Sequence, residues 1–311
     1  MEIRSEKVLI TGISGFVGTA LSRELRVGGY HVVGSSRNRL IDESDVKIFS
    51  TSSIGRDTDW GLALQGCDVV VHLAARAHIL KDPDAEPLES FREINTAGTL
   101  NLARQAALEG VRKFIFISSI GVNGDRTGQK AFRYNDEASP HSFYAKSKYE
   151  AEKGLLDLSC DCNMDIIIVR VPAVYGYKTP GNIGKLEKLV KSGLPIALGN
   201  INNKRSFIAI DNLVSFIKTC IEHPPLEAKI FVISDGVELS TSELLKVLSI
   251  IHCKRLRLIS VPAFIQKWLL KYFSKHSSVQ SLLGDLVVDS SYACSQLSWV
   301  PIFDPLESDS K

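Results

Sequence analysis

The chain has 311 residues, of which 44% are hydrophobic and 23% are charged. This composition is ordinary for a globular protein and excludes a disordered, collagen-like or coiled-coil chain. The 37 Lys and Arg residues nearly balance the 35 Asp and Glu residues and leave a formal net charge of +2. Such a balance provides no field for binding nucleic acid or an anionic membrane surface, so neither is an expected partner.

The 6 cysteines are too few for a disulfide scaffold. Cys160 and Cys162 lie closer together than the usual zinc-binding pair, and no second ligand pair follows them, so no metal is expected. The first residues lead directly into a strand pattern without the apolar segment of a signal peptide. No run approaches ~18 consecutive apolar residues, the length that a transmembrane helix needs. We therefore expect a cytoplasmic protein with no membrane-inserted segment.

Strand-like apolar runs alternate with helical patterns up to residue 172. In chain order we expect the strand Lys7–Thr11, the helix Phe16–Val27, the strands His31–Gly34 and Asp68–Leu73, the helix Asn95–Glu109, the strand Phe114–Ser118, the helix Tyr144–Leu158 and the strand Ile166–Val171. Apolar strands separated by helices are typical of a parallel sheet covered on both faces. The pattern therefore predicts an α/β fold with a Rossmann-like doubly wound parallel sheet.

After Pro172 the chain becomes less regular. The segments Val174–Pro180 and Gly193–Arg205 are rich in Gly, Pro, Asn and Tyr, which is typical of loops that contact ligands. Strands are expected at Arg205–Asp211 and Lys229–Ser234, with a helix between them.

The Ser, Thr and Glu residues that begin Ser240–Ser249 indicate a capped helix. A single core rarely extends beyond about 250–300 residues, so the length suggests one large domain or two modest ones. We expect a dinucleotide-binding domain over 1–172 and a smaller C-terminal α/β substrate-binding domain over 173–311. Part of 205–235 is expected to return to the main sheet.

Three evenly spaced glycines follow the first strand and open the first helix. Gly12, Gly15 and Gly18 form a G-x-x-G-x-x-G motif. Gly12 permits a tight turn, Gly15 allows the backbone to approach a pyrophosphate, and Gly18 allows the helix to pack closely on the sheet. The N–H groups and dipole at the helix N-terminus favour an anionic phosphate. The motif in this context predicts a dinucleotide site.

Further motifs follow along the chain. They are Asp68-Val-Val-Val-His-Leu-Ala-Ala75, Asn95 with Gly98-Thr-Leu-Asn-Leu102, Ser118-Ser119, Tyr144-x-x-x-Lys148 and Arg205-Ser-Phe-Ile-Ala-Ile-Asp211. Together with the glycine motif, they make nearly the whole chain resemble the extended short-chain dehydrogenase/reductase family. The resemblance is to its nucleotide-sugar epimerase, dehydratase and reductase branch, and it implies an NAD(P)-dependent enzyme with a UDP-sugar substrate.

The resemblance also implies which residues hold the cofactor and how the chain assembles. The cofactor-binding residues that it implies are Gly12, Ser14, Gly15, Phe16, Val17, Gly18, Ser36, Arg37, Ile54, Leu73, Ala74, Ala75, Asn95, Tyr144, Lys148 and Pro172. His72, inside a buried strand, is expected to be a core histidine. Family members often form homodimers through a face that includes the Tyr-bearing helix. Ala151, Leu155 and Leu158 suit either that face or the core.

Two positions depart from the NAD-binding pattern. Ser36 stands where NAD-specific members carry the acidic residue that binds the adenosine ribose. Arg37 and Arg39 follow it and suit a 2′-phosphate, so NADP(H) is favoured and NAD(H) is the alternative. Ser53, next to Ile54, replaces an Asp that contacts adenine in many members of the family.

The catalytic residues are expected to be Tyr144, Lys148 and Ser119. Tyr144 and Lys148 share one face of a helix, and the ammonium favours the phenolate of the tyrosine, whose reference pKa is ~10. Tyr144 then exchanges a proton with a sugar hydroxyl while a hydride moves to or from the nicotinamide. Ser119 ends a strand at the sheet edge where ligands bind, and it is expected to contact the substrate as well.

The second part of the chain is expected to contribute the remaining substrate contacts. Arg205 matches the family position whose guanidinium binds the nucleotide diphosphate. Asn182 and Lys185 are further candidates. Ala173 replaces a substrate-binding Asn of the family.

Two reactions that share a 4-keto sugar remain open. The departures at Ser36 and Arg37 favour an exchanging cofactor, and hence 4-keto reduction of a UDP-linked amino sugar. The alternative is a 4-epimerase of UDP-glucose or UDP-N-acetylglucosamine with tightly bound NAD. A dehydratase is disfavoured because Ile120 and Gly121 follow Ser119 where that class carries Asp-Glu. A non-catalytic NADP-binding sensor is disfavoured because the Tyr and Lys are both present.

Overall fold

The chain divides into two compact units in the computed structural model, which describes residues 6–37, 46–51, 53–77, 87–226, 229–261 and 284–304. Unit 1 comprises Met1–Gly124, Tyr134–Arg170 and Val214–Phe231, and unit 2 comprises Asp125–Arg133, Val171–Leu213 and Val232–Lys311. Neither unit is therefore one continuous stretch of chain. One passage between them, from Arg170 to Val171, lies next to the boundary expected at Pro172.

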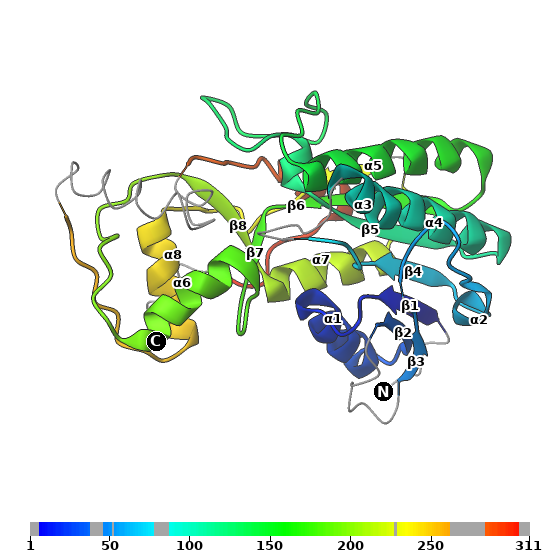
Figure 1. Ribbon diagram of the computed structural model, residues 1–311, viewed down its shortest axis with the longest axis horizontal. Coiled ribbons are helices and arrows are strands. Elements are labelled where there is room, and N and C mark those ends of the chain that lie inside the picture. The colour runs from blue at the N-terminus through cyan, green and yellow to red at the C-terminus, as the bar shows by residue number, and fades with distance from the viewer. Residues whose placement is uncertain are drawn as a thin grey trace. The chain divides into compact units, whose positions relative to one another are not determined.

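A parallel sheet forms the core layer of unit 1 (Figure 1). Over the described residues it is 7-stranded, in the order β3 (Lys47–Ser50), β2 (His31–Ser36), β1 (Lys7–Thr11), β4 (Val69–His72), β5 (Lys113–Ser119), β6 (Asp165–Val171) and β9 (Ile230–Val232). Because β1 pairs in parallel with both β2 and β4, the strand order reverses there. Doubly wound sheets bind ligands at such a reversal. The expected Rossmann-like fold is confirmed.

Helices cover both faces of this sheet. They are α1 (Phe16–Val27), α2 (Gly61–Leu64), α3 (Pro87–Arg92), α4 (Gly98–Leu108) and α5 (Phe143–Asp161), with the π-helical turn η1 (Glu93–Ala97) and the 3-10 turn η2 (Ile120–Val122). Figure 1 shows α1 on the side of the sheet away from α4 and α5. One apolar core joins α2, α4 and α5 to the strands. Ala151 and Leu155 are completely buried in it, so they are core residues and not an exposed dimer face.

Unit 2 contains a smaller sheet. Its strands are β10 (Glu238–Leu239), β8 (Arg205–Ala209) and β7 (Ala173–Tyr175), in that order. The described helices of the second half are α6 (Gly181–Ser192), α7 (Ile210–Glu222), α8 (Thr241–Ile251) and α10 (Ser291–Leu297), of which α7 belongs to unit 1 from Val214 onward. α6 and α8 pack around Phe207 of β8. Ser240 and Glu243 form a capping box at the start of α8, as the sequence predicts.

Some expected segments have a different structure. The strand expected over Arg205–Asp211 ends at Ala209, because α7 begins at Ile210. That strand pairs in the small sheet, so Ile208 does not return to the main sheet, whereas Phe231 in β9 does. Asn182 lies on α6, which the sequence analysis had not predicted. Arg39 lies outside the described residues.

Within the part of the chain that the structure describes, no helix is long and apolar enough to cross a membrane.

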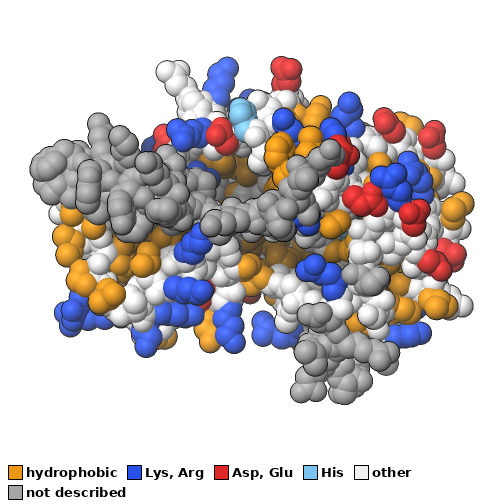
Figure 2. All heavy atoms as spheres, in the orientation of Figure 1, with side chains coloured by type: hydrophobic (Ala, Val, Ile, Leu, Met, Phe, Trp, Pro, Cys, Tyr) orange, Lys and Arg blue, Asp and Glu red, His pale blue; other side chains and the backbone are white. Residues whose placement is uncertain are grey.

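Acidic and basic side chains are interspersed over the helices of unit 1 (Figure 2), in keeping with the near-neutral net charge of the chain. Arg92, for example, pairs with both Glu89 and Glu150.

Candidate active site

The glycine motif forms the turn between β1 and α1. Gly12 has a φ of +68°, which residues with a side chain rarely adopt. Its N–H and that of Ile13 donate to Ser35 O at 3.1 and 3.3 Å. Gly15 is the N-cap of α1 and provides no capping side chain. The N–H groups of the first turn of α1 are therefore not capped by that residue, which suits a phosphate.

The first and last glycines of the motif lie close to other backbone atoms. A Cβ on Gly18 would lie 2.3 Å from Gly12 O and 2.7 Å from Ile13 Cα. A Cβ on Gly12 would lie 3.1 Å from Ala74 N and Cα, in the turn that follows β4. The close packing that the glycine spacing predicts is therefore present, and it holds α1 against the loop.

A pocket of about 520 Å³ in unit 1 contains most of the residues proposed for the cofactor. Those that line it are Gly12, Ser14, Gly15, Ser36, Arg37, Ile54, Leu73, Ala74 and Ala75. Phe16, Val17 and Gly18 lie in the first turn of α1, and Pro172 lies in unit 2 between β6 and β7. The volume, the glycine turn and the uncapped helix N-terminus together fit a dinucleotide.

The end of β2 is the position expected for the adenosine ribose. No Asp or Glu is among the described residues that line the pocket. Ser36 Oγ lies 2.8 Å from Ser14 Oγ, and Arg37 lines the same pocket. A hydroxyl pair beside a guanidinium accommodates a 2′-phosphate as well as a free 2′-hydroxyl.

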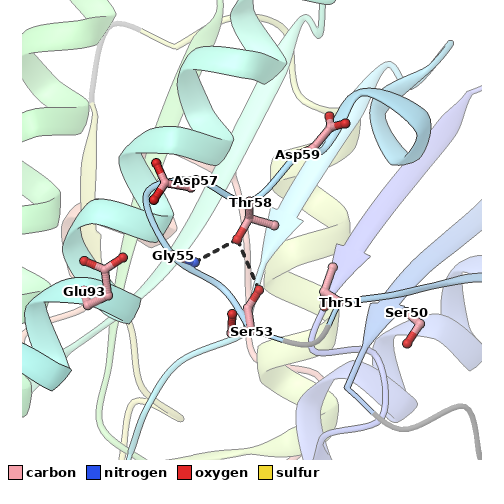
Figure 3. A pocket seen from close by; sticks show the side chains of 8 residues that line it. All are labelled: Ser50, Thr51, Ser53, Gly55, Asp57, Thr58, Asp59 and Glu93. Carbon is pink, nitrogen blue, oxygen red and sulfur yellow. Dashed lines mark hydrogen bonds between the residues drawn. The ribbon is translucent and has the colours of Figure 1, made fainter.

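A second pocket of about 410 Å³ shares Thr51 and Ser53 with the first. Figure 3 shows Thr58 at its centre. Thr58 Oγ1 accepts a hydrogen bond from Gly55 N–H at 2.9 Å and donates one to Ser53 O at 3.1 Å. These two bonds fix the loop that brings Ile54 into the wall of the first pocket.

Tyr144 and Lys148 lie one turn apart on α5. Lys148 is completely buried, and its Nζ donates a hydrogen bond to Ile117 O at 2.8 Å. The same nitrogen lies 4.2 Å from the centroid of the Phe116 ring and 6.0 Å from that of the Tyr144 ring. The amine of Lys148 is therefore fixed between the end of β5 and the tyrosine.

Burial changes the acid–base chemistry of both residues. It raises the pKa of Tyr144 to about 12 and lowers the pKa of Lys148 to about 7, although the charge of Glu152 opposes the second shift. Lys148 therefore changes its charge near neutral pH. A group that titrates in this range and lies beside a phenol is suited to proton exchange.

We expect Lys148→Met to alter the pH dependence of stability. Lys148 has a pKa of about 7 in the folded chain and an ordinary value of 10.5, so between these values the unfolded chain binds the proton more strongly. Its contribution to the free energy of unfolding therefore rises with pH, by about 1.4 kcal/mol per unit over roughly pH 7.5 to 9. The free energy of unfolding of Lys148→Met minus that of the unmodified protein should therefore decrease with pH at that rate.

Urea unfolding of both proteins at several pH values measures this difference. The two proteins share every other titratable group, so the difference isolates Lys148. A difference that stays constant with pH would mean that the folded protein keeps this lysine protonated.

Ser119 ends β5 and caps the turn η2. Its Oγ accepts a hydrogen bond from Gly121 N–H at 3.1 Å, so the hydroxyl hydrogen is not used in that bond and suits donation to a ligand. Ser118 is completely buried and donates to Glu152. Of the two serines, Ser119 is the one whose side chain is partly accessible.

Asn95 in η1 positions the main chain after β4. Its Oδ1 accepts from Arg76 N–H at 2.8 Å, and its Nδ2 donates to Arg76 O and to Ser147 Oγ, both at 3.0 Å. Ser147 lies between Tyr144 and Lys148 on α5. Asn95 therefore ties the turn after β4 to that helix.

His72 is part of the core, as expected, and burial lowers its pKa to about 3. Thr99 donates its hydroxyl hydrogen to Asn95 O at 2.7 Å, so it accepts from His72 Nε2–H at 2.9 Å. His72 Nδ1 then accepts from Thr11 at 2.7 Å, and Thr11 Oγ1 accepts from Ala74 N–H at 3.3 Å. The neutral ring is thus fixed in one tautomer and is not a base.

The sequence analysis missed a buried ion pair next to these residues. Glu152 on α5 and Arg170 on β6 are 1% and 3% exposed, and Arg170 Nη2 lies 2.7 Å from Glu152 Oε2. Two features of the sequence could have indicated this pair. They are an arginine within an apolar strand and a glutamate one helical turn after Lys148. Residues of either type usually lie at the surface, so buried examples indicate a specific role.

Unit 2 contains the candidate substrate residues Arg205 and Asn182. Arg205 is 6% exposed, and its Nη1 donates to Gly284 O at 2.8 Å. Burial lowers its pKa to about 10, and its Nε has no hydrogen-bond partner among the described residues. A buried cation with an unused donor suits an anionic oxygen. Asn182 lies in the first turn of α6.

Comparison with known proteins identifies the family of the chain. Residues 8–234 match the family described as NAD dependent epimerase/dehydratase. The UDP-glucose 4-epimerase of Vibrio cholerae is 42% identical over 298 residues, which cover 95% of this chain and 91% of that protein.

Solved structures share the fold over almost the whole chain. The UDP-glucose 4-epimerase of Thermotoga maritima, crystallised with UDP-glucose, has a TM-score of 0.75 at 21% identity and covers 97% of this chain and 95% of its own. MoeE5 in complex with UDP-glucose and NAD has a TM-score of 0.76 at 21% identity, with 98% and 96% covered. At these identities the likeness shows the fold alone.

Proposed function

Since the chain belongs to the NAD dependent epimerase/dehydratase family, we propose that it is a 4-epimerase of a UDP-hexose with NAD as its cofactor. The single observation that carries this choice is the 42% identity to a UDP-glucose 4-epimerase over 95% of the chain. The sequence favoured 4-keto reduction as the main reaction, and the comparisons support the epimerase alternative better.

The proposed cofactor site is the 520 Å³ pocket of unit 1. The glycine turn and the first turn of α1 would hold the pyrophosphate, and Lys148 the nicotinamide ribose. When bound, the dinucleotide supplies the hydride acceptor and donor. Asn95 would keep the turn after β4 in place, because it hydrogen-bonds both the N–H and the C=O of Arg76.

Tyr144 would take the proton from the 4-hydroxyl of the sugar and later return it to the same oxygen. Its pKa of about 12 makes the isolated phenol a poor base, so the ammonium form of Lys148 is needed to favour the phenolate. Ser119 would donate its free hydroxyl hydrogen to the reacting oxygen. For epimerisation, the 4-keto sugar would present its other face, so that C4 regains the hydride on that face while Tyr144 returns the proton to the oxygen.

Arg205 would bind the diphosphate of the substrate, since it is a buried cation whose Nε–H has no hydrogen-bond partner among the described residues. Asn182 is a further proposed contact. A cytoplasmic location and a homodimer that uses helices of unit 1 are also proposed, and both rest on the family resemblance.

A specific observation favours the second candidate, 4-keto reduction of a UDP-linked amino sugar. An epimerase retains its NAD, and a carboxylate that binds the ribose helps it do so. The pocket instead offers Ser36 and Arg37, with no acidic side chain among its described lining residues. Those residues are compatible with an NADP(H) that exchanges in every cycle.

One assay separates the two candidates. The purified protein is analysed for retained dinucleotide and then incubated, without added cofactor, with UDP-glucose or UDP-galactose and with UDP-N-acetylglucosamine or UDP-N-acetylgalactosamine. We expect interconversion within one pair without net change in nicotinamide absorbance. Absence of interconversion, together with stoichiometric oxidation of NADPH by UDP-4-keto-6-deoxy-N-acetylglucosamine, would replace the epimerase by the reductase.

A further inference from the structure

A buried ion pair lies one helical turn from Lys148. Arg170 Nε lies 3.1 Å from each carboxylate oxygen of Glu152, and its Nη2 lies 2.7 Å from Oε2. The guanidinium therefore holds the carboxylate by more than one N–H group, which fixes both distance and orientation. The side chains of Glu152 and Arg170 are 1% and 4% exposed, so solvent does not screen the pair.

Each member of the pair forms a further hydrogen bond with a buried polar side chain. Ser118 on β5 donates to Glu152 Oε1 at 2.5 Å, and Arg170 Nη1 donates to Asn123 Oδ1 at 3.1 Å. The network thus joins β5, η2, α5 and β6 through four buried side chains.

Two of the proposed catalytic residues, Ser119 and Lys148, lie next to members of this network along the chain. Ser119 follows Ser118 in β5, so a fixed Ser118 also fixes the main chain that carries the Ser119 hydroxyl. Glu152 follows Lys148 by one turn of α5, which places the two side chains on one face of the helix.

Stability alone does not explain such a pair. Burying two charges is costly, and well-packed apolar side chains of similar volume often replace buried ion pairs without loss of stability. A fully hydrogen-bonded buried network instead provides rigidity and a fixed local charge. Both properties are useful where a proton must move between defined atoms.

We propose that, for the reaction proposed above, Glu152 and Arg170 are positioning residues that act on Ser119 through Ser118 and favour the ammonium form of Lys148. Neither residue is proposed to contact the substrate or the cofactor. Arg170 orients the carboxylate of Glu152, and the hydrogen bond from Ser118 links that carboxylate to β5. The carboxylate also provides the negative charge near Lys148.

The other groups that face Lys148 do not provide that charge. Tyr144 lies on the same helix and is a neutral phenol, because burial raises its pKa to about 12. His72 faces it from β4 and is neutral, because burial lowers its pKa to about 3. The Phe116 ring and Ile117 O face it from β5. Among the described residues, Glu152 is the acidic group whose charge raises the pKa of Lys148.

The test is Glu152→Gln in the full chain with its dinucleotide. The amide keeps the shape of the side chain and its acceptor for Ser118, and it removes the charge. We expect the alkaline limb of the kcat–pH profile to move down by about one pH unit. At pH 8, kcat should fall about 10-fold, with KM for the UDP-sugar within about two-fold of the original, because the ammonium form is depleted.

Two further variants separate position from charge. Ser118→Ala keeps the ion pair and breaks its link to β5, so kcat should fall while the alkaline limb stays in place. Glu150→Gln is the matched control, since Glu150 lies on the same helix and pairs with Arg92 at the surface. This control should change neither kcat nor the position of the alkaline limb of the kcat–pH profile.

A measurement that needs no turnover distinguishes this proposal from the proposed function. In the Glu152→Gln background, the stability difference between Lys148 and Lys148→Met should begin to change about one pH unit lower than in the unmodified chain. If this shift is observed in a protein without epimerase activity, the proposed function is wrong and the proposed effect of Glu152 on Lys148 is retained. An unchanged onset, or a folded Glu152→Gln protein with an unaltered kcat–pH profile, would overturn the positioning role. If Glu152→Gln does not fold, the kcat of Ser118→Ala is the deciding measurement. A kcat equal to that of the unmodified protein would then overturn the positioning role.

Discussion

Tyr144→Phe is expected to lower kcat for UDP-sugar interconversion by about 10²- to 10⁴-fold, the range typical of a lost general acid–base group. The substitution removes the hydroxyl and keeps the ring. That ring packs edge-on against Phe91, with centroids 6.4 Å apart at an angle of 67°. The packing of α5 against α3 should therefore survive, and the protein should still retain its dinucleotide.

Tyr149→Phe provides the matched control for this variant. Tyr149 lies on the same helix, and its ring is 5.9 Å from Lys153 Nζ rather than near Lys148. We expect it to keep full turnover. Steady-state kinetics and the dinucleotide content of each purified protein are the measurements. A Tyr144→Phe enzyme within about ten-fold of the original kcat would remove Tyr144 from the catalytic role.

The sequence was most informative where one local rule governs the structure. Lys7–Thr11 and Phe16–Val27 are observed with the predicted bounds, because an apolar run followed by a glycine turn and an amphipathic pattern leaves little choice. The apolar runs of β1, β4, β5 and β6 also predicted a parallel sheet, whereas the polar edge strand β3 (Lys47–Ser50) was not predicted. The short strand β7 was missed, because Gly, Pro and Tyr in Val174–Pro180 indicated a loop, and the helix α6 was not predicted either.

The sequence predicted only those residues of the candidate site that belong to recognisable motifs. The pocket brings together Gly15, Arg37 and Ala74 from three strand ends, as parallel topology requires. The partners of Glu152 were not accessible in this way. They come from β5 and β6, and a pairing between side chains on different strands depends on register and depth that no local pattern encodes.

Gly18→Ala is expected to impair cofactor retention and to destabilise the fold. The new Cβ would lie 2.3 Å from Gly12 O and 2.8 Å from Ile13 O, both main-chain atoms that cannot rotate away. Since carbon–oxygen contacts this short do not persist, α1 must move relative to the loop. Overpacking of this kind typically costs about 1–3 kcal/mol. The movement also displaces the N–H groups of the helix start from any bound phosphate, so affinity and stability fall together.

Gly128→Ala separates this steric effect from the general effect of replacing glycine, because a Cβ there would meet no atom within 4 Å. Thermal unfolding and the dinucleotide content of both purified variants are the measurements. If Gly18→Ala kept the original melting temperature and a full complement of dinucleotide, the helix could tolerate the displacement, and the glycine spacing would not be the reason that the pocket holds its cofactor. A stable variant that had lost only the dinucleotide would instead mean that α1 shifts without unfolding, which places the effect of Gly18 on the phosphate site itself.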